Sequence, residues 1–161
     1  MLSKLFSPAG MEMKLKAGDQ EQAFRELISL VPNLNDGGRA GLLLSLLGRE
    51  RLGTTALGRS VALPHTRYAV PGIAKPRIIF GRHPEGIVYG APDGAPVRLF
   101  FLLVSPDVSQ HLQILSRLTR LLRNSALIER LLSAATPEEA LRAIDSAERE
   151  LPAPLAAAAA A

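Results

Sequence analysis

The chain has 161 residues and a mass of 17.2 kDa, with 47% hydrophobic and 21% charged residues. This is ordinary globular composition, and it excludes a disordered tail protein and a fibre. The absence of cysteine excludes disulfide scaffolds, cysteine–zinc sites and thiol catalysis. The net charge of +4 is compatible with an anionic partner, but the chain has five Phe, two Tyr and no Trp. A platform that stacks single-stranded bases needs more aromatic residues, so we expect no nucleic-acid partner.

Neither a membrane span nor a secretion signal is indicated. The longest apolar run, residues 99–104, is too short to cross a bilayer. The N-terminal residues lack the long apolar segment of a signal peptide. We therefore expect a cytoplasmic protein with no direct membrane insertion.

The first half of the chain predicts one strand followed by two helices. Residues 11–15 alternate between apolar and polar side chains, which is the period of a strand. Asp19 can cap a helix whose apolar residues recur at helical spacing, and Pro32 stops that helix. The turn at residues 35–38 (NDGG) supplies the cap of a second helix, which ends near residues 48–53.

The middle of the chain predicts three short strands, at residues 61–63, 77–80 and 97–104. The last of these is nearly all apolar, which favours a central strand covered on both faces. The segments between them are rich in Gly and Pro. We expect long, ordered loops there, of the kind that often carry function.

The last third of the chain predicts three helices. Asp107 caps the first, whose leucines form one stripe. A short helix follows around residues 128–132. Thr136 begins the third, because Pro137 and Glu139 stand at the positions that favour a helix start.

The element order β-αα-βββ-ααα indicates an α/β fold, a three-layer α/β/α sandwich with a small mixed sheet. We assign residues 1–150 to a single domain. Residues 151–161 form a Pro- and Ala-rich tail, and its prolines break any helix that reaches it. We expect that tail to be frayed.

Common nucleotide and metal motifs are absent from the sequence. It contains no G-x-x-x-x-G-K-[ST], no G-x-G-x-x-G after a strand and no H-E-x-x-H. Ser60 does not lie in a nucleophile elbow because the second glycine of that motif is missing. A three-histidine metal site lacks both a helical histidine pair and a carboxylate to complete it. We therefore expect no cofactor and no metal.

His65 is the first candidate for chemistry. It follows the predicted strand at residues 61–63 and Pro64, whose fixed φ makes a stiff mount for a side chain that must be aimed. A neutral imidazole is nucleophilic near pH 7, because its free pKa is about 6.5. The alternative is a surface or capping histidine.

His111 and Arg49 are the other candidates. His111 lies near the start of the helix that Asp107 caps, where the helix dipole favours an anion; the alternative is an exposed histidine at a helix start. The guanidinium of Arg49 suits a phosphoryl group, or else it meets the dipole at the end of its helix. His83 is predicted to be a solvated loop residue.

Several segments resemble one known family. Residues 49–55 (RERLGTT) resemble its R-E-x-L-G-S/T-T segment, and residues 57–65 (LGRSVALPH) resemble its histidine signature. Residues 93–97 (DGAPV) resemble its D-G-x-P-V, and residues 101–112 resemble its second histidine region. The family is enzyme IIA of the fructose/mannitol class of the bacterial phosphoenolpyruvate-dependent phosphotransferase system (PTS), which includes nitrogen-regulatory paralogues. The resemblance runs from about residue 2 to residue 144.

This resemblance implies both a fold and a set of roles. The fold is an α/β/α sandwich with a mixed sheet. His65 is implied to accept a phosphoryl group from phospho-HPr and to pass it to a cysteine of a IIB domain. His111 is implied to be the second active-site histidine and Arg49 the arginine that meets the phosphoryl charge. Thr66 departs from the Gly, Ala or Cys usual there, so we expect a tighter pocket beside His65 or an added hydroxyl.

Three functions remain open at this point. The first is a IIA component that feeds a sugar transporter. The second is a nitrogen-type regulatory protein whose phosphorylation state controls its binding to target proteins. The third is a binding module that works without phosphorylation, and an RNA-binding domain is the outside alternative.

Overall fold

The computed structural model describes residues 1–153 and contains one mixed sheet of five strands. The strands are β1 (Met11–Glu12), β2 (Ala56–Gly58), β3 (Val61–Ala62), β4 (Arg77–Ile87) and β5 (Val97–Val104). Their order across the sheet is β1-β4-β5-β3-β2. β1 pairs with β4 and β3 with β5 in parallel, whereas β4 pairs with β5 and β2 with β3 antiparallel. The apolar strand β5 therefore occupies the centre, as its sequence predicts.

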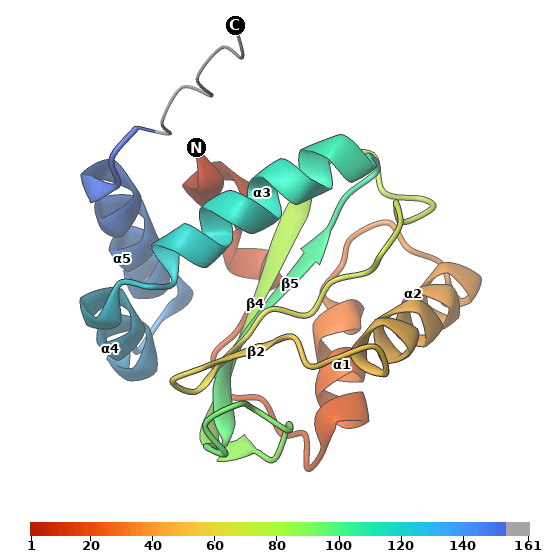
Figure 1. Ribbon diagram of the computed structural model, residues 1–161. Coiled ribbons are helices and arrows are strands. Elements are labelled where there is room, and N and C mark those ends of the chain that lie inside the picture. Colours follow the sequence, from red (N-terminus) through yellow and green to blue (C-terminus); the bar gives the residue numbers. More distant parts are fainter. Residues whose placement is uncertain (154–161) are drawn as a thin grey trace, which may run out of the picture.

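Helices cover both faces of this sheet. One face is covered by α3 (Val108–Leu121), α4 (Ser125–Ser133) and α5 (Pro137–Glu150), together with the short 3₁₀ helices η1 (Leu2–Leu5) and η2 (Pro8–Gly10). The other face is covered by α1 (Gln20–Ser29) and α2 (Asp36–Glu50). Figure 1 shows the two groups of helices on opposite sides of β4 and β5. The predicted three-layer sandwich is confirmed.

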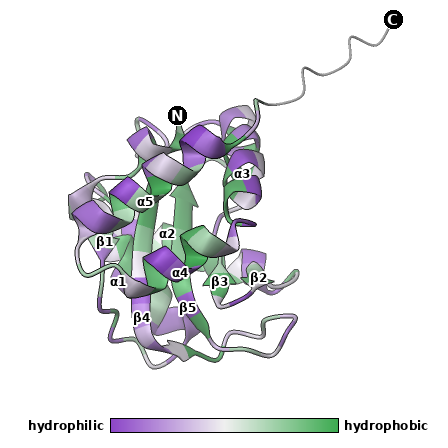
Figure 2. Cartoon of the chain, turned by 90° about the vertical axis from the view of Figure 1, so that its left-hand side faces the viewer, coloured by the Kyte–Doolittle hydropathy of each residue, from purple (hydrophilic) through white to green (hydrophobic). Residues whose placement is uncertain are grey.

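The alternation of side chains along β5 divides the hydrophobic core in two. Leu99, Phe101 and Leu103 pack with α3, α4 and α5, and Phe100 and Leu102 pack with α1 and α2. All five are fully buried. Each such side chain contributes about 1.5–3 kcal/mol of burial free energy. In Figure 2 the central strands are mainly green, whereas the helices carry both green and purple segments.

Each α-helix begins at a side-chain cap. The capping side chain accepts a hydrogen bond from the backbone N–H three residues on, which satisfies one of the free donors of the first turn. The pairs are Asp19 with Gln22 (2.8 Å), Asn35 with Gly38 (2.7 Å), Asp107 with Gln110 (2.7 Å), Asn124 with Leu127 (3.1 Å) and Thr136 with Glu139 (3.2 Å). The predicted helix starts after Asp19, Asn35, Asp107 and Thr136 are confirmed.

The strand predictions for residues 11–15 and for the middle of the chain need correction. The order of elements is β-αα-ββββ-ααα, because β2 was not predicted. Its three residues are too few to show an alternating pattern. The strand predicted at 77–80 continues to Ile87, and the one predicted at 11–15 is a two-residue strand.

Two glycines allow β4 to continue where the sequence suggests a loop. A Cβ at Gly81 would lie 2.7 Å from a methyl of Leu15 and 2.7 Å from a methyl of Leu27. Gly86 has φ +95°, and its Cβ would lie 2.6 Å from Pro96. These glycines mark close packing within the sheet rather than turns.

His83 is not the solvated loop residue that was predicted. It lies in β4, where the register with β5 is irregular between Arg82 and Ile87. Its Nε2 lies 2.8 Å from the carbonyl of Ala17, and its Nδ1 accepts the N–H of Gly86 at 2.8 Å. A carbonyl oxygen only accepts and a backbone N–H only donates, so Nε2 carries the proton. His83 thus joins the irregular part of β4 to the segment before α1.

The C-terminal segment is described only in part. α5 ends at Glu150, and the residues to 153 follow without regular structure. The rest of the predicted tail lies outside the described residues. None of the helices within residues 1–153 combines the length and apolar character needed to span a bilayer.

Candidate active site

The backbone at His65 is held by the central strand. His65 forms an isolated parallel bridge with Leu103 of β5, and the N–H of Leu103 donates to the carbonyl of Pro64 at 3.0 Å. The Nδ1 atom of His65 lies 2.8 Å from the carbonyl oxygen of Leu63. Because that oxygen can only accept, Nδ1 carries the proton and Nε2 keeps its lone pair. The local backbone therefore selects the tautomer of His65.

His111 lies beside His65. The two rings have centroids 5.6 Å apart and an interplanar angle of 47°. His111 is in the first turn of α3 and only 5% exposed. Its Nε2 is buried and has no hydrogen-bond partner within residues 1–153. An unpaired buried polar atom costs about 1–3 kcal/mol, so this nitrogen is suited to bind a group that arrives at His65.

Both histidines are held in their neutral form. The pKa of His65 is lowered, and the largest cause is burial. The positive charge of Arg49 also lowers this pKa, whereas the bond to Leu63 and the negative charge of Glu50 raise it by less than the total lowering. Burial, and then the charge of His65, lowers the pKa of His111. A neutral imidazole has a nucleophilic lone pair, whereas an imidazolium has none. The environment thus favours the neutral form of the His65 imidazole.

Arg49 lies in the last turn of α2. One terminal nitrogen of its guanidinium donates to the carbonyl of Gly53 at 2.9 Å, which orders the loop after the helix. Its positive charge acts on His65, where it lowers the pKa. The structure thus brings Arg49 into the electrostatic environment of His65.

A hydrogen-bonded cluster formed by Glu50, Thr55 and Tyr89, next to Arg49 in the chain, was not predicted from the sequence. The carboxylate of Glu50 accepts the N–H of Thr55 at 3.2 Å, the hydroxyl of Thr55, and the hydroxyl of Tyr89 at 2.8 Å. The hydroxyls of Thr55 and Tyr89 lie 2.8 Å apart. Burial, and then the charge of Glu50, raises the pKa of Tyr89 far above its ordinary value, so Tyr89 stays a donor. The sequence shows Glu50 and Thr55 close together, but Tyr89 lies in a Gly-rich segment with no pattern that links it to them.

A second contact that sequence reasoning missed joins the β2–β3 turn to the end of α3. Arg59 has φ +53°, and its guanidinium donates to the carbonyls of Leu122 (2.8 Å) and Arg123 (3.1 Å). Asp93 accepts the N–H of Arg59 at 2.8 Å, and the N–H groups of Arg59 and Ala95 lower the pKa of this carboxyl. β3 leads to His65 and α3 carries His111, so Arg59 helps to hold the two elements of the site together.

Thr66 adds a hydroxyl beside His65, but that hydroxyl is occupied. Thr66 is buried, and its Oγ1 donates to the carbonyl of Tyr68 at 2.6 Å. The hydroxyl therefore closes a short turn after His65. Among residues 1–153, no group of three or more His, Cys, Asp or Glu side chains could hold a metal ion.

Comparison with known proteins places this fold and site in one family. Residues 4–147 match the family described as "Phosphoenolpyruvate-dependent sugar phosphotransferase system, EIIA 2". The chain belongs to this family, in agreement with the resemblance noted in its motifs.

Relatives in the family include both regulatory and transport proteins. A "Nitrogen regulatory protein" of Bradyrhizobium diazoefficiens is 35% identical over 81% of this chain and 85% of its own length. The "PTS system fructose-specific EIIABC component" of Bacillus subtilis is 26% identical over 92% of this chain and 24% of its own length.

Solved structures of both a nitrogen regulatory protein and a sugar-specific IIA protein resemble this fold. "Nitrogen Regulatory Protein IIA-Ntr" from Neisseria meningitidis has a TM-score of 0.79 at 29% identity, covering 88% of this chain and 97% of its own. "IIA mannitol" from Escherichia coli has a TM-score of 0.72 at 26% identity, covering 86% and 97%. Both share the sandwich described above.

Proposed function

We propose that residues 1–150 act as one phosphoryl-carrier domain whose phosphorylated atom is Nε2 of His65. The observation that carries the proposal is the histidine pair. His65 has its Nδ1 proton bound to the carbonyl of Leu63, and beside it His111 presents a buried Nε2 with no hydrogen-bond partner among residues 1–153. The first provides a lone pair, and the second provides a site for an oxygen of the incoming group.

The transfer requires no cofactor. The lone pair of His65 Nε2 forms the new N–P bond while the bond from phosphorus to the donor breaks, and the donor keeps that electron pair. The Nδ1 proton stays on the ring and remains hydrogen-bonded to the carbonyl of Leu63. Phosphoryl transfer asks the protein mainly for positioning and for stabilisation of charge. Arg49 and an Nε2–H of His111 supply that stabilisation, helped by the N-terminus of α3.

The donor in this proposal is phospho-HPr, and the surface near the site fits a protein partner. Large apolar side chains are exposed within three residues of each site residue: Leu52 is near Arg49, Tyr68 is near His65, and Val108 and Leu112 are near His111. Apolar residues around a polar centre are typical of a surface that docks another protein.

Two acceptors are compatible with this chemistry. The structure titled "Complex of enzyme IIAMTL and phosphorylated enzyme IIBMTL" shows that relative with a IIB partner, which supports transfer to a IIB cysteine for sugar uptake. The nitrogen regulatory relatives support a second candidate, in which phosphorylation at His65 controls binding to a target protein. In that candidate the added charge acts as a switch at the docking surface. A module that works without phosphorylation would not need the three residues of the site.

The test is intact mass after incubation with phosphoenolpyruvate, enzyme I and HPr. The wild-type chain should gain one acid-labile phosphoryl group, and His65→Ala should gain none. A chain without phosphoenolpyruvate is the control. A wild-type chain that gains nothing from its cognate HPr, or a His65→Ala variant that gains the group at the normal rate, would overturn the proposal.

A second experiment separates the two acceptors. The phosphorylated chain is mixed with a fructose-type IIB domain and with its Cys→Ser variant. Transfer to the wild-type IIB alone supports sugar uptake. No transfer, together with a cellular partner that binds only one phosphorylation state, supports the regulatory function.

A further inference from the structure

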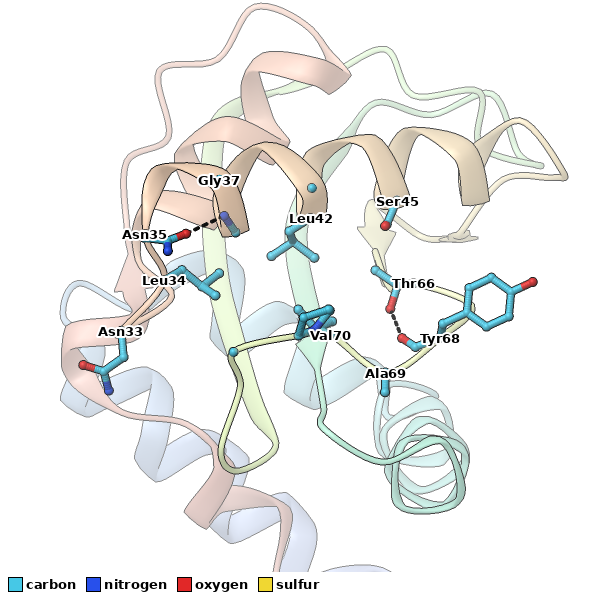
Figure 3. Close-up of a pocket in the computed structure, with 14 residues that line it drawn as sticks. Asn33, Leu34, Asn35, Gly37, Leu42, Ser45, Thr66, Tyr68, Ala69 and Val70 are labelled. Carbon is cyan, nitrogen blue, oxygen red and sulfur yellow. Dashed lines mark hydrogen bonds between the residues drawn. The ribbon is translucent and has the colours of Figure 1, made fainter.

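A cavity of about 480 Å³ lies between the first half of α2 and the loop of residues 66–72. Figure 3 shows Leu34, Leu42 and Val70 at its centre, with Thr66 at one side. Its volume is in the range of small-molecule sites, about 300–1,000 Å³. Its wall includes Thr66, the residue directly after His65, so it adjoins the site described above without containing either histidine.

Part of the α2 wall of the cavity is formed by glycines, which place no side chain in it. Gly37, Gly38 and Gly41 all line it, followed by Ser45. A Cβ at Gly41 would meet no atom within 4 Å, so packing within the protein does not require glycine there. A glycine inside a helix costs about 1 kcal/mol relative to alanine. Glycine at this position leaves this part of the cavity wall free of a side chain, at a cost in helix stability.

The composition of the wall selects the class of ligand. None of the lining residues is Lys, Arg, His, Asp or Glu. Polar groups come from Asn33, Ser45, Tyr68 and the backbone, while Oδ1 of Asn35 and the hydroxyl of Thr66 are already bonded to backbone groups. An ion entering such a site would lose hydration without gaining a counter-charge.

We infer that this cavity binds an uncharged small molecule with an apolar body and a few hydrogen-bonding groups, and that its occupancy is coupled to the phosphorylation of His65. The coupling rests on the proposed function, whereas the binding does not.

The loop that forms one wall of the cavity is tied to both histidines. Thr66 adjoins His65 in the chain and closes its turn through Tyr68. The N–H of Val70 donates to the carbonyl of Ser105 at 2.9 Å, and the hydroxyl of Ser105 accepts the N–H of Asp107 at 3.3 Å. Asp107 caps α3, the helix that carries His111.

A ligand that contacts Thr66 and Val70 therefore touches a segment connected to His65 and to the start of the helix that carries His111. Coupling between two sites is reciprocal: a ligand that changes phosphorylation must bind the two forms of the chain with different affinities.

The binding is tested on the unphosphorylated, ¹⁵N-labelled full chain. Benzamide, 2-phenylethanol and cyclohexanol serve as neutral probes, and benzoate and inorganic phosphate serve as charged controls. At millimolar concentrations, at least one neutral probe should shift the backbone amides of Gly41, Ser45 and Val70, and benzoate and phosphate should not. No shift at these amides with any neutral probe, or equal shifts with benzamide and benzoate, would overturn the site.

Two matched variants locate the binding. Gly41→Leu places a side chain at the cavity wall and should weaken the binding of the probe at least several-fold. Gly48→Leu lies in the same helix outside the cavity wall, and a Cβ there also meets nothing within 4 Å. It should leave probe affinity unchanged. Equal affinity of the two variants for the probe would place the binding elsewhere.

The coupling is tested by titrating the same probe into the chain before and after phosphorylation. The two affinities should differ by about five-fold or more, the lower end of typical coupling between sites. Equal affinities would overturn the coupling. If the wild-type chain accepts no phosphoryl group, the proposed function fails, and the first titration still decides whether the cavity binds the probe.

Discussion

The ring of His65 lies 5.6 Å, centroid to centroid, from the ring of His111. One histidine is placed by the central sheet and the other by the first turn of α3. The first has its Nδ1 bonded to a backbone carbonyl, and the second has a buried Nε2 with no partner in the described part of the chain. In the proposed function, His65 is the nucleophile and His111 is the hydrogen-bond donor, and the first prediction tests these roles.

His111→Ala should slow phosphorylation of His65 by about 10- to 100-fold, because a donor to a charged group is lost from a buried site. His111→Gln should recover part of the rate, since its amide N–H can reach the position of the imidazole Nε2. Rates are measured by quenched-flow mass analysis with phospho-HPr. A His111→Ala rate equal to that of wild type would show that His111 does not contact the phosphoryl group.

The phosphorylation rate should persist below the ordinary pKa of histidine. Burial lowers the pKa of His65, so the neutral nucleophile survives at pH values where a free imidazole of pKa about 6.5 is protonated. The rate should therefore fall only at an apparent pKa below about 6.5. A pH–rate profile, paired with ¹⁵N detection of the His65 ring, checks this. A midpoint above 6.5 would contradict it.

Folding stability should also decrease as the pH is lowered through this range. Below about pH 6.5 the unfolded chain binds protons at His65 and His111 that the folded chain, with its lowered pKa values, does not bind. The free energy of unfolding should then rise with pH up to about 7 and level off above it. Urea unfolding at a series of pH values measures this slope, which His111→Gln should reduce.

Tyr89→Phe should destabilise the fold by about 1–3 kcal/mol, because Glu50 loses a buried donor. Tyr68→Phe is the matched control: Tyr68 is 69% exposed, and its loss of a hydroxyl should change stability by less than about 0.5 kcal/mol. Urea unfolding of both variants at pH 7 is the measurement. Equal stabilities of the two would mean that the cluster of Glu50, Thr55 and Tyr89 does not stabilise the loop after α2.

Gly81→Ala should destabilise the fold by about 1–3 kcal/mol, the usual penalty of overpacking. The added Cβ would lie 2.7 Å from a methyl of Leu15 and from a methyl of Leu27, and both leucines are buried. Gly48→Ala is the control: its Cβ meets nothing within 4 Å, and alanine favours the helix by about 1 kcal/mol. Thermal unfolding should shift in opposite directions for the two variants. A neutral Gly81→Ala would indicate that the two leucines can move aside.

The sequence by itself determined the family, the sandwich and the identity of the candidate residues. Caps at Asp19, Asn35, Asp107 and Thr136 act within one helical turn, so the residues that form each cap can be read directly from the chain. The apolar character of residues 97–104 likewise marks a central strand, because burial on both faces leaves no polar alternation.

Only the tertiary structure decided how those residues interact. β4 runs through glycines and a proline because partners distant in sequence pack against it, and no local pattern carries that information. The hydrogen bond between His83 and the carbonyl of Ala17 was not predicted because its two residues are also distant in sequence. The pairing of His65 with His111, the burial of the His111 ring and the contact of Tyr89 with Glu50 depend on the distances between segments joined by the sheet. Local spacing specifies helices and strands, whereas a site depends on which of them the core brings into contact.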